Sequence, residues 1–178
     1  MHARSEVHVA ARAGGDGLAL TRWHCEPPLT VRHTVDGLTM MASAGGPLGG
    51  DDLGLTLQVG ADASVRVGSA AATLVLPGPA ALRPPPPASL TWTVTVDEHA
   101  SLDWRPEPTV VAQGAVLRAR TTVTVAGTGR VRWREVLAAG RVGEQGGDVL
   151  TSWSVVVAGR CLLRQDVHIG PHAPTGWD

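Results

Sequence analysis

The chain has 178 residues with a formal net charge of -1, and it contains neither phenylalanine nor tyrosine. The near-neutral charge argues against the basic field that typifies nucleic-acid binding or attachment to an anionic membrane. The two cysteines, Cys25 and Cys161, form no CxxC pair, and the first residues contain no apolar core of the kind found in signal peptides. We therefore expect a cytoplasmic protein without a membrane span.

The stretch GGPLGGDDLGLTLQVG, residues 45–60, is the first element with a clear pattern. After Asp51 and Asp52, every second residue is apolar, as in a strand with one buried face. A strand following the glycines, together with the absence of lysine, argues against a phosphate-binding loop. Adjacent aspartates on a strand point to opposite faces, which disfavours a shared metal ion. The pattern favours a glycine turn in which an aspartate caps local N–H groups.

Alternation of this kind recurs at residues 90–96, 117–125, 130–137, 151–157 and 161–169. Short turns separate these runs, and we expect roughly a dozen strands in all. The pattern predicts an all-β fold with antiparallel strands in stacked sheets, either a sandwich or a β-helix-like coil, and little helix. A short helix is expected only at residues 135–140. We expect residues 1–178 to form a single β domain.

Three segments share one layout, at residues 59–67, 96–104 and 125–133. In each, a strand ends in valine, four turn residues follow, and an alternating strand begins. These lengths predict repeated hairpins whose loops hold one residue at positive φ. An ordinary β-meander would produce a similar sequence repeat, so both a repeated hairpin unit and a simple meander remain possible.

Glu135 is the acidic residue with the most informative position. It falls on the same face of its run as Val131, Trp133 and Leu137, so a continuous strand would direct its carboxylate into an apolar layer. A buried carboxylate is costly unless it is paired or hydrogen-bonded. Its partner could be Arg141, Arg105 or Arg120. Alternatively, the strand ends near Arg134 and leaves Glu135 at the rim.

The seven histidines form no HExxH or C2H2 spacing, although His24 adjoins Cys25 and His168 lies four residues before His172. Surface or structural roles are the simpler interpretation of each. Arginines also alternate along two runs, one with Arg118 and Arg120 and the other with Arg130, Arg132 and Arg134. Such rows typify the solvated face of a sheet, and they could also meet an acidic partner.

Four segments, taken in order, resemble the urease accessory protein D family, which is called H in some organisms. They are GGPLGGDDLGLTLQVGADASVRVGSAAAT (45–73), SLDWRPEPTVVAQGAVLRARTTVTV (101–125), WREVLAAGR (133–141) and LTSWSVVVAGRCLLRQDVHIG (150–170). The family pattern is similar: a GGD turn, an A-A-T segment, a W-x-P-E element and a WRE-like element that ends in GR. Most members continue beyond the point that corresponds to Asp178, so we expect a short form.

The resemblance implies a non-catalytic, chaperone-like maturation factor. Family members join accessory protein F and the GTPase accessory protein G on the urease apoenzyme and help to deliver nickel, which is bound only transiently. Carboxylates suit a passage for such an ion, because weak oxygen ligands let it enter and leave. The implied lining residues are Asp51, Glu107 and Glu135. The implied binding or structural residues are Asp52, Arg141, Gly49 and Gly50.

Two other hypotheses remain. A structural or protein-binding β module without a metal role would use the GGDD stretch only as a turn and Glu135 only as a salt-bridged core acid. An enzyme, such as a metal hydrolase that uses Asp51, Glu107 and His24, has little support, because no nucleophile motif occurs in the sequence.

Overall fold

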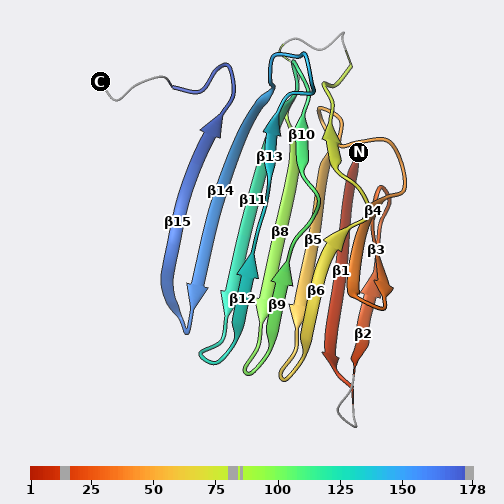
Figure 1. Cartoon of the computed structure of the whole chain (residues 1–178), viewed down its shortest axis with the longest axis vertical. Helices are drawn as coiled ribbons and strands as arrows, with labels where there is room; N and C mark the ends of the chain where they lie inside the picture. Colours follow the sequence, from red (N-terminus) through yellow and green to blue (C-terminus); the bar gives the residue numbers. More distant parts are fainter. Residues whose placement is uncertain (13–16, 80–83, 85, 175–178) are drawn as a thin grey trace.

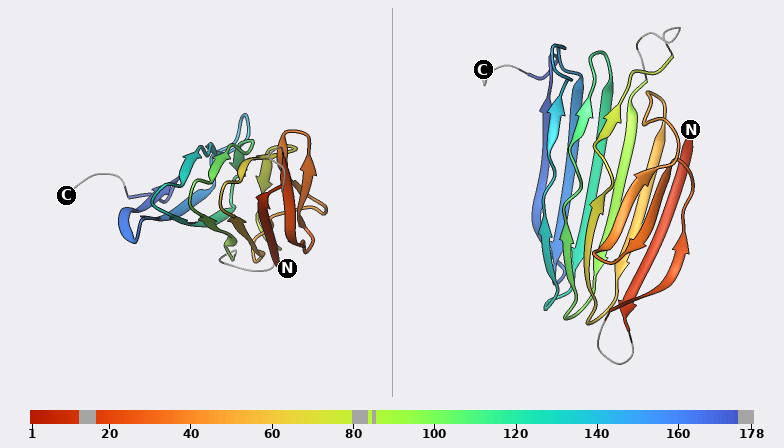
Figure 2. Two further views of the ribbon diagram at one scale, coloured as in Figure 1. Left: turned by 90° about the horizontal axis from the view of Figure 1, so that it is seen from below. Right: turned by 45° about the vertical axis from the view of Figure 1, so that its right-hand side comes forward.

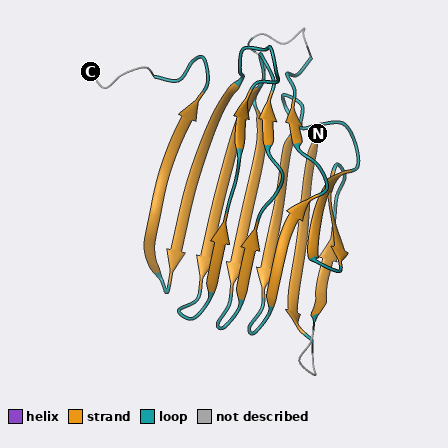
Figure 3. Ribbon diagram, in the orientation of Figure 1, coloured by secondary structure: helices purple, strands orange, loops and turns teal. Residues whose placement is uncertain are grey.

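The computed structural model describes residues 1–12, 17–79, 84 and 86–174. Within these residues the chain forms fifteen strands and no helix (Figure 3). The strands form two layers, with one long sheet on one side and two shorter sheets on the other (Figure 2). The all-β prediction is therefore confirmed. Among the described residues there is no helix with the length and apolar character needed to cross a bilayer.

The first layer is a seven-stranded sheet (Figure 1). Its strands, from one edge to the other, are β15 (Arg160–Ile169), β14 (Asp148–Val157), β11 (Val116–Val125), β8 (Ala88–Val96), β5 (Asp52–Val59), β1 (His2–Ala11) and β2 (Leu18–His24). The second layer contains a five-stranded and a three-stranded sheet. The five-stranded sheet runs β12 (Arg130–Trp133), β9 (Ser101–Trp104), β6 (Ser64–Ser69), β4 (Gly37–Ala42) and β3 (Leu29–Thr34). The three-stranded sheet runs β13 (Leu137–Ala139), β10 (Thr109–Val111) and β7 (Thr73–Val75).

The chain winds through these sheets as a coil. Each turn of the coil takes one strand from each sheet, in the order β5–β6–β7, then β8–β9–β10, then β11–β12–β13. Neighbouring turns therefore pair in parallel, as in the ladder that joins β5, β8, β11 and β14. Of the twelve strand pairs in the described part of the chain, three are antiparallel, namely β1–β2, β3–β4 and β14–β15. The stacked-coil prediction is confirmed, and the antiparallel prediction is wrong for most of the fold.

The three repeated turns connect the two layers and do not close hairpins. The turn after β8 begins with Asp97, whose N–H donates to Val59 in the previous coil at 2.9 Å. Ala126, at the start of the next turn, donates in the same way to Val96 at 2.8 Å. Asp62 and His99 both adopt positive φ, so the predicted left-handed position exists in two of the turns. The three repeated segments therefore form equivalent corners of successive coils, and these corners stack on one another.

The predicted strand at residues 130–137 is divided, and the predicted helix at residues 135–140 is wrong. β12 ends at Trp133, the chain crosses an irregular segment, and β13 begins at Leu137. β13 pairs in parallel with β10, with Leu137 opposite Thr109. Pairing with the previous coil therefore overrides the local helix preference of EVLAA.

The core fills the space between the layers and divides into two apolar clusters. The larger lies between the seven- and five-stranded sheets, and the smaller contacts the three-stranded sheet. Tryptophans supply the aromatic bulk. Trp104 and Trp133 are register partners on β9 and β12, and their rings stack with centroids 4.3 Å apart. Trp92 and Trp153 extend this row on either side.

Candidate functional site

The candidate site lies where the second layer changes from the five-stranded to the three-stranded sheet. The chain leaves the former at Ser69, Trp104 and Trp133, and it enters the latter a few residues later. A cavity of about 240 Å³ lies at these crossings. Most of its wall is apolar, including Met40, Leu53 and Leu90, and its polar residues are Ser69, Thr73, Thr109, Glu107 and Glu135.

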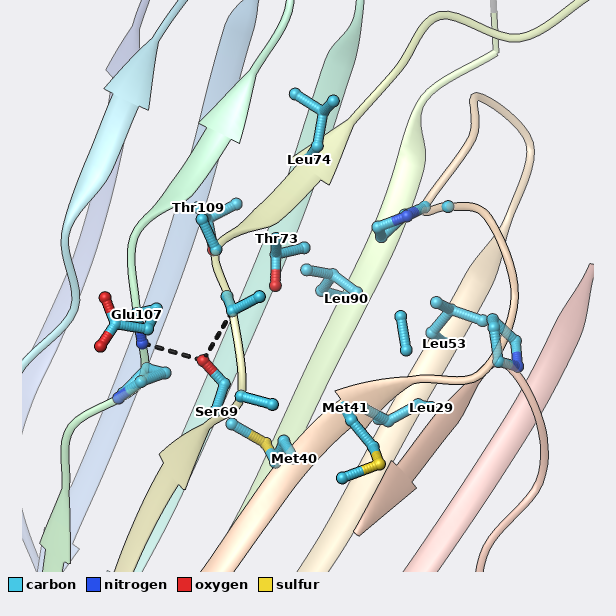
Figure 4. A pocket seen from close by; sticks show the side chains of 18 of the residues that line it. Leu29, Met40, Met41, Leu53, Ser69, Thr73, Leu74, Leu90, Glu107 and Thr109 are labelled. Atoms are coloured by element: carbon cyan, nitrogen blue, oxygen red, sulfur yellow. Dashed lines mark hydrogen bonds between the residues drawn. The ribbon is translucent and has the colours of Figure 1, made fainter.

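Ser69 holds two of the crossing segments together (Figure 4). Its hydroxyl donates to the carbonyl of Ala71 at 3.0 Å and accepts the backbone N–H of Glu107 at 2.9 Å. Sequence reasoning missed Ser69, because no motif marks a serine that joins two crossing segments. In Figure 4 the Glu107 side chain lies at the edge of the cavity, with its carboxylate directed away from Leu90. Glu107 is exposed to solvent.

Glu107 and Glu135 hold equivalent positions in successive coils. Each lies two residues before the first residue of its strand in the three-stranded sheet. Those first residues, Thr109 and Leu137, are direct register partners. Both glutamates contribute to the same cavity wall. The coil therefore repeats an acidic position at the crossing, with the first acid exposed and the second half-buried.

Glu135 also lines a second, larger cavity of about 550 Å³. This cavity lies between β12 and the strands β11, β14 and β15, and its wall is almost entirely apolar. Among the described residues, Glu135 alone lines both cavities. Its side chain therefore stands at the junction between them.

The environment of Glu135 disfavours its charged form. Among the described residues it makes no ion pair, so the predicted pairing with Arg141, Arg105 or Arg120 is not observed. Burial raises the pKa of Glu135, and the nearby indole of Trp133 offsets only part of this effect. The Trp133 Nε1 atom is buried and has no hydrogen-bond partner in the described part of the chain. The half-buried Glu135 carboxylate and the buried indole N–H of Trp133 thus lie close together at the junction, without a cationic partner for the carboxylate among the described residues.

Asp51 stabilises the glycine turn. Its Oδ2 atom accepts the backbone N–H of Leu48 at 2.9 Å, and its own N–H donates to the Leu48 carbonyl at 2.8 Å. Its Oδ1 atom pairs with the amino group of Met1 at 2.6 Å. The side chain is buried and is not among the residues that line either cavity. Its position is that of the capping aspartate which the turn pattern predicts.

The glycines of this turn are packed closely. A β-carbon on Gly49 would lie 2.5 Å from the backbone nitrogen of Gly78, and Gly50 has a φ of +94°. The N–H of Gly49 donates to Leu76, so the turn adds a short bridge to the edge of the three-stranded sheet. Only glycine fits both positions without displacing backbone.

Asp52 and Arg141 make contacts away from the cavities. Asp52 pairs with Arg4 at 2.6 Å on the partly exposed side of β5, and the hydrogen bond from Arg4 lowers the pKa of Asp52. Arg141 is exposed and pairs with Glu144, in the loop between β13 and β14. The Arg141 hydrogen bonds lower the pKa of Glu144 to about 2. Neither Asp52 nor Arg141 lines a cavity with Glu107 or Glu135.

The structure does not bring together the residues of the hypothetical hydrolase. His24 is exposed at the edge of the long sheet and contacts Glu26 at 3.2 Å, while Asp51 lies in its turn and Glu107 at the cavity. The described residues contain no cluster of three His, Cys, Asp or Glu side chains arranged to hold a metal ion.

A polar cluster that sequence reasoning missed lies at the start of β14. Asp148 is buried and accepts hydrogen bonds from the His172 ring, from the backbone N–H of His172 at 3.0 Å and from His168 at 3.1 Å. Burial acts to raise the pKa of Asp148, but these bonds hold it below its ordinary value. The spacing of His168 and His172 was the available signal, but the β14–β15 pairing was needed to locate their partner.

The fold and the site together define a parallel β-coil in which two successive coils each place one acid at the same cavity. The chain belongs to the UreD urease accessory protein family, whose family model, described as UreD urease accessory protein, matches residues 1–176. It is 39% identical to the urease accessory protein UreD of Frankia alni over 189 residues. It is 39% identical to urease accessory protein UreD 3 of Streptomyces griseus and 38% identical to UreD of Streptomyces coelicolor.

These matches cover nearly all of this chain and part of each relative. They include 96% of the chain and 58% of the Frankia alni protein, and 100% of the chain and 71% of the Streptomyces griseus protein. The chain thus spans less than two thirds of the length of the Frankia alni relative. The family resemblance in the sequence is confirmed.

Proposed function

We propose that this chain is a non-catalytic scaffold in urease maturation that helps nickel to reach the urease active site. Membership of the UreD family supports the maturation role. The observation that carries the nickel proposal is the placement of Glu135 at the junction of two cavities. Together these cavities extend from the crossing segments to the inner side of β14 and β15.

In this proposal the nickel ion meets the two glutamates one after the other, first Glu107 and then Glu135. Glu107 is exposed at the edge of the first cavity and presents a carboxylate to a cation that arrives from solvent. Glu135 lies further inside and lacks a cationic partner among the described residues, so a passing cation would relieve the cost of its buried charge. Separate single carboxylates bind an ion weakly, which allows release as well as entry. Nickel is therefore cargo and not a resident cofactor.

The other residues named from the family resemblance have a supporting role. Asp51, Gly49 and Gly50 fix the turn against the edge of the three-stranded sheet, and Gly46 and Pro47 of the same turn line the first cavity. We propose that Asp51 holds this wall in place. Asp52 and Arg141 stabilise the local surface through Arg4 and Glu144.

We further propose that the chain works in the cytoplasm with accessory protein F, the GTPase accessory protein G and the urease apoenzyme. Family membership supports these partners. Both cysteines are free thiols, Cys25 half-buried and Cys161 exposed, which suits a reducing compartment.

Co-expression provides the direct test. Urease subunits and the other accessory factors are produced with and without this chain, and the nickel content and activity of purified urease are measured. The proposal expects both quantities to fall when the chain is omitted. Urease that acquires nickel and activity equally well without the chain would overturn it.

A further inference from the structure

The edge strand of the five-stranded sheet, β12, and the residue that follows it carry a row of arginines. Arg130, Arg132 and Arg134 are exposed, and none of them forms an ion pair within the described residues. The arginines further along this face differ, because Arg66 and Arg105 both contact Asp103, at 3.7 and 2.6 Å. Asp103 is the register partner of Arg132 but pairs with Arg66 and Arg105 instead, so the face keeps an excess of positive charge that favours an anionic partner.

The backbone of β12 is also free on one side. Among the described strands, β12 is the last of its sheet and pairs only with β9. Arg130 and Arg134 donate their N–H groups to Ala100 and Trp104 on the β9 side. Because the N–H and C=O groups alternate in direction along a parallel ladder, those of Val131 and Trp133 point to the open side. A further strand can therefore pair with β12.

The space beside this edge has an apolar floor. The long sheet continues past β12 with β14 and β15, and no described strand of the second layer lies in front of β15 (Figure 1). The cavity of about 550 Å³ lies here. Its wall includes the apolar residues Val131, Trp133, Trp153, Val155, Leu162 and Leu163. Leu162 is 71% exposed, which leaves a large apolar side chain uncovered.

We propose that the open side of β12 binds an extended segment of a partner protein, in which acidic residues alternate with apolar ones. Side chains alternate along a strand, and adjacent strands lie about 4.8 Å apart. A segment paired with β12 would therefore place one set of side chains beside the three arginines and the other set in the apolar cavity. Acidic residues match the first set of positions, and apolar residues match the second.

A second copy of this chain does not fit the surface. Each described strand contains at most one acidic residue, so none presents a row of carboxylates to match the arginines. The inference is argued from the β12 edge, its arginines and the apolar cavity beside it, and it does not require that nickel pass through that cavity.

The test uses a short fluorescent peptide in which glutamate and valine alternate. A control peptide has the same composition, with the glutamates and valines grouped in two blocks. Fluorescence anisotropy is measured over a range of salt concentrations, and hydrogen exchange follows the amides of Val131 and Trp133. We expect the alternating peptide to bind more tightly than the block peptide, to lose affinity as salt rises, and to protect both amides.

Charge reversal identifies the surface. The triple variant Arg130→Glu/Arg132→Glu/Arg134→Glu is expected to weaken binding at least about tenfold, and the milder triple replacement by Gln by a smaller factor. The matched control Arg118→Glu/Arg120→Glu changes exposed arginines on the outer face of the long sheet, and it should leave the affinity unchanged. Melting curves verify that each variant is folded.

Three outcomes would overturn the inference. They are equal binding of the two peptides, equal loss of affinity in the triple and control variants, and tighter binding of a single-stranded oligonucleotide at the same arginines. Self-association of the chain that protects the amides of Val131 and Trp133 would also contradict it, because the site would then accept a second copy.

Discussion

Glu107 and Glu135 occupy the same place in successive turns of the β-coil, each two residues before a strand of the three-stranded sheet. The two strands pair with Thr109 opposite Leu137. The two glutamates are therefore equivalent both in their spacing from the strand and in the register of the sheet. The two glutamates differ in how far they are buried. Glu107 is exposed at the edge of one cavity, whereas Glu135 is half-buried between two. This difference gives the two residues separate, testable signatures.

The first prediction concerns the stability of the Glu135→Gln variant. Burial raises the pKa of Glu135 above its ordinary value of 4.5, so the folded state binds the proton more strongly than the unfolded state. Stability is therefore lost as pH rises from that ordinary value through the folded pKa. Glutamine is neutral at every pH, so the variant should melt at a higher temperature than the parent at neutral pH. Well below pH 4.5 the two should melt alike.

Thermal melting across this pH range checks the prediction. A variant that is less stable than the parent at neutral pH would show that Glu135 has a stabilising partner, as the salt-bridged core hypothesis requires. Val136→Ala serves as a control at the neighbouring position, since Val136 is 37% exposed and carries no charge. Its effect on stability should not depend on pH.

The second prediction concerns Glu107→Gln. Glu107 is exposed and its side chain makes no ion pair among the described residues, so its replacement should change stability by less than about 0.5 kcal/mol. Activation of urease in cells should nevertheless fall, because the cavity edge loses its carboxylate. Asp166→Asn on β15 removes an exposed acid elsewhere and should leave activation unchanged. Equal activation by the Glu107 variant and the control would count against a role at the edge.

The third prediction concerns the buried cluster around Asp148. Its pKa lies below the ordinary value of 3.8, so its stabilising contribution is present above that value and is lost as pH falls through the folded pKa. Asp148→Asn should lower the free energy of unfolding at neutral pH by about 1–3 kcal/mol, because the bonds from His168 and His172 are weakened. Urea unfolding measures this loss, and the difference should shrink in strong acid. An undiminished difference there would show that charge is not its cause.

The fourth prediction compares two glycines of the same turn. A β-carbon on Gly49 would lie 2.5 Å from the backbone of Gly78 and 2.6 Å from the Pro86 carbonyl. Gly49→Ala should therefore destabilise the protein by about 2 kcal/mol, through forced movement of backbone. The β-carbon of Gly45→Ala would meet nothing within 4 Å, and that variant should melt like the parent. Similar melting temperatures for the two variants would contradict the close packing of the turn.

The positions of most strands could be predicted from alternation alone, because period-two patterning directly reports one buried face. β5, β8, β11, β14 and β15 all occur where the pattern places them. The direction of pairing could not be predicted in this way. A four-residue turn suits a hairpin as well as a corner between layers, and only contacts between distant coils distinguish the two. Parallel sheets usually have two apolar faces, but the outer face of β8 carries Thr91, Thr93 and Thr95.

The candidate site was only partly accessible to sequence reasoning. Alternation placed Glu135 on the face of Val131 and Trp133, and it lines the second cavity with both, although β12 ends before it. Glu107 could be named only through the family resemblance, because its neighbours Pro106 and Pro108 interrupt any periodic pattern. Ser69 and Asp148 could not be found, since their partners are 38 and at least 20 residues away. Such contacts exist only once the coil has closed.

The most direct test of the central claim is the nickel content of urease matured with the Glu107→Gln/Glu135→Gln double variant. Urease is purified after co-expression with the parent chain, the double variant or the Asp166→Asn control, and metal is quantified per active site. Co-purification with urease verifies that each chain is folded and bound. We predict a several-fold loss of nickel with the double variant alone. Full nickel loading with a folded, urease-bound double variant would contradict the proposed passage.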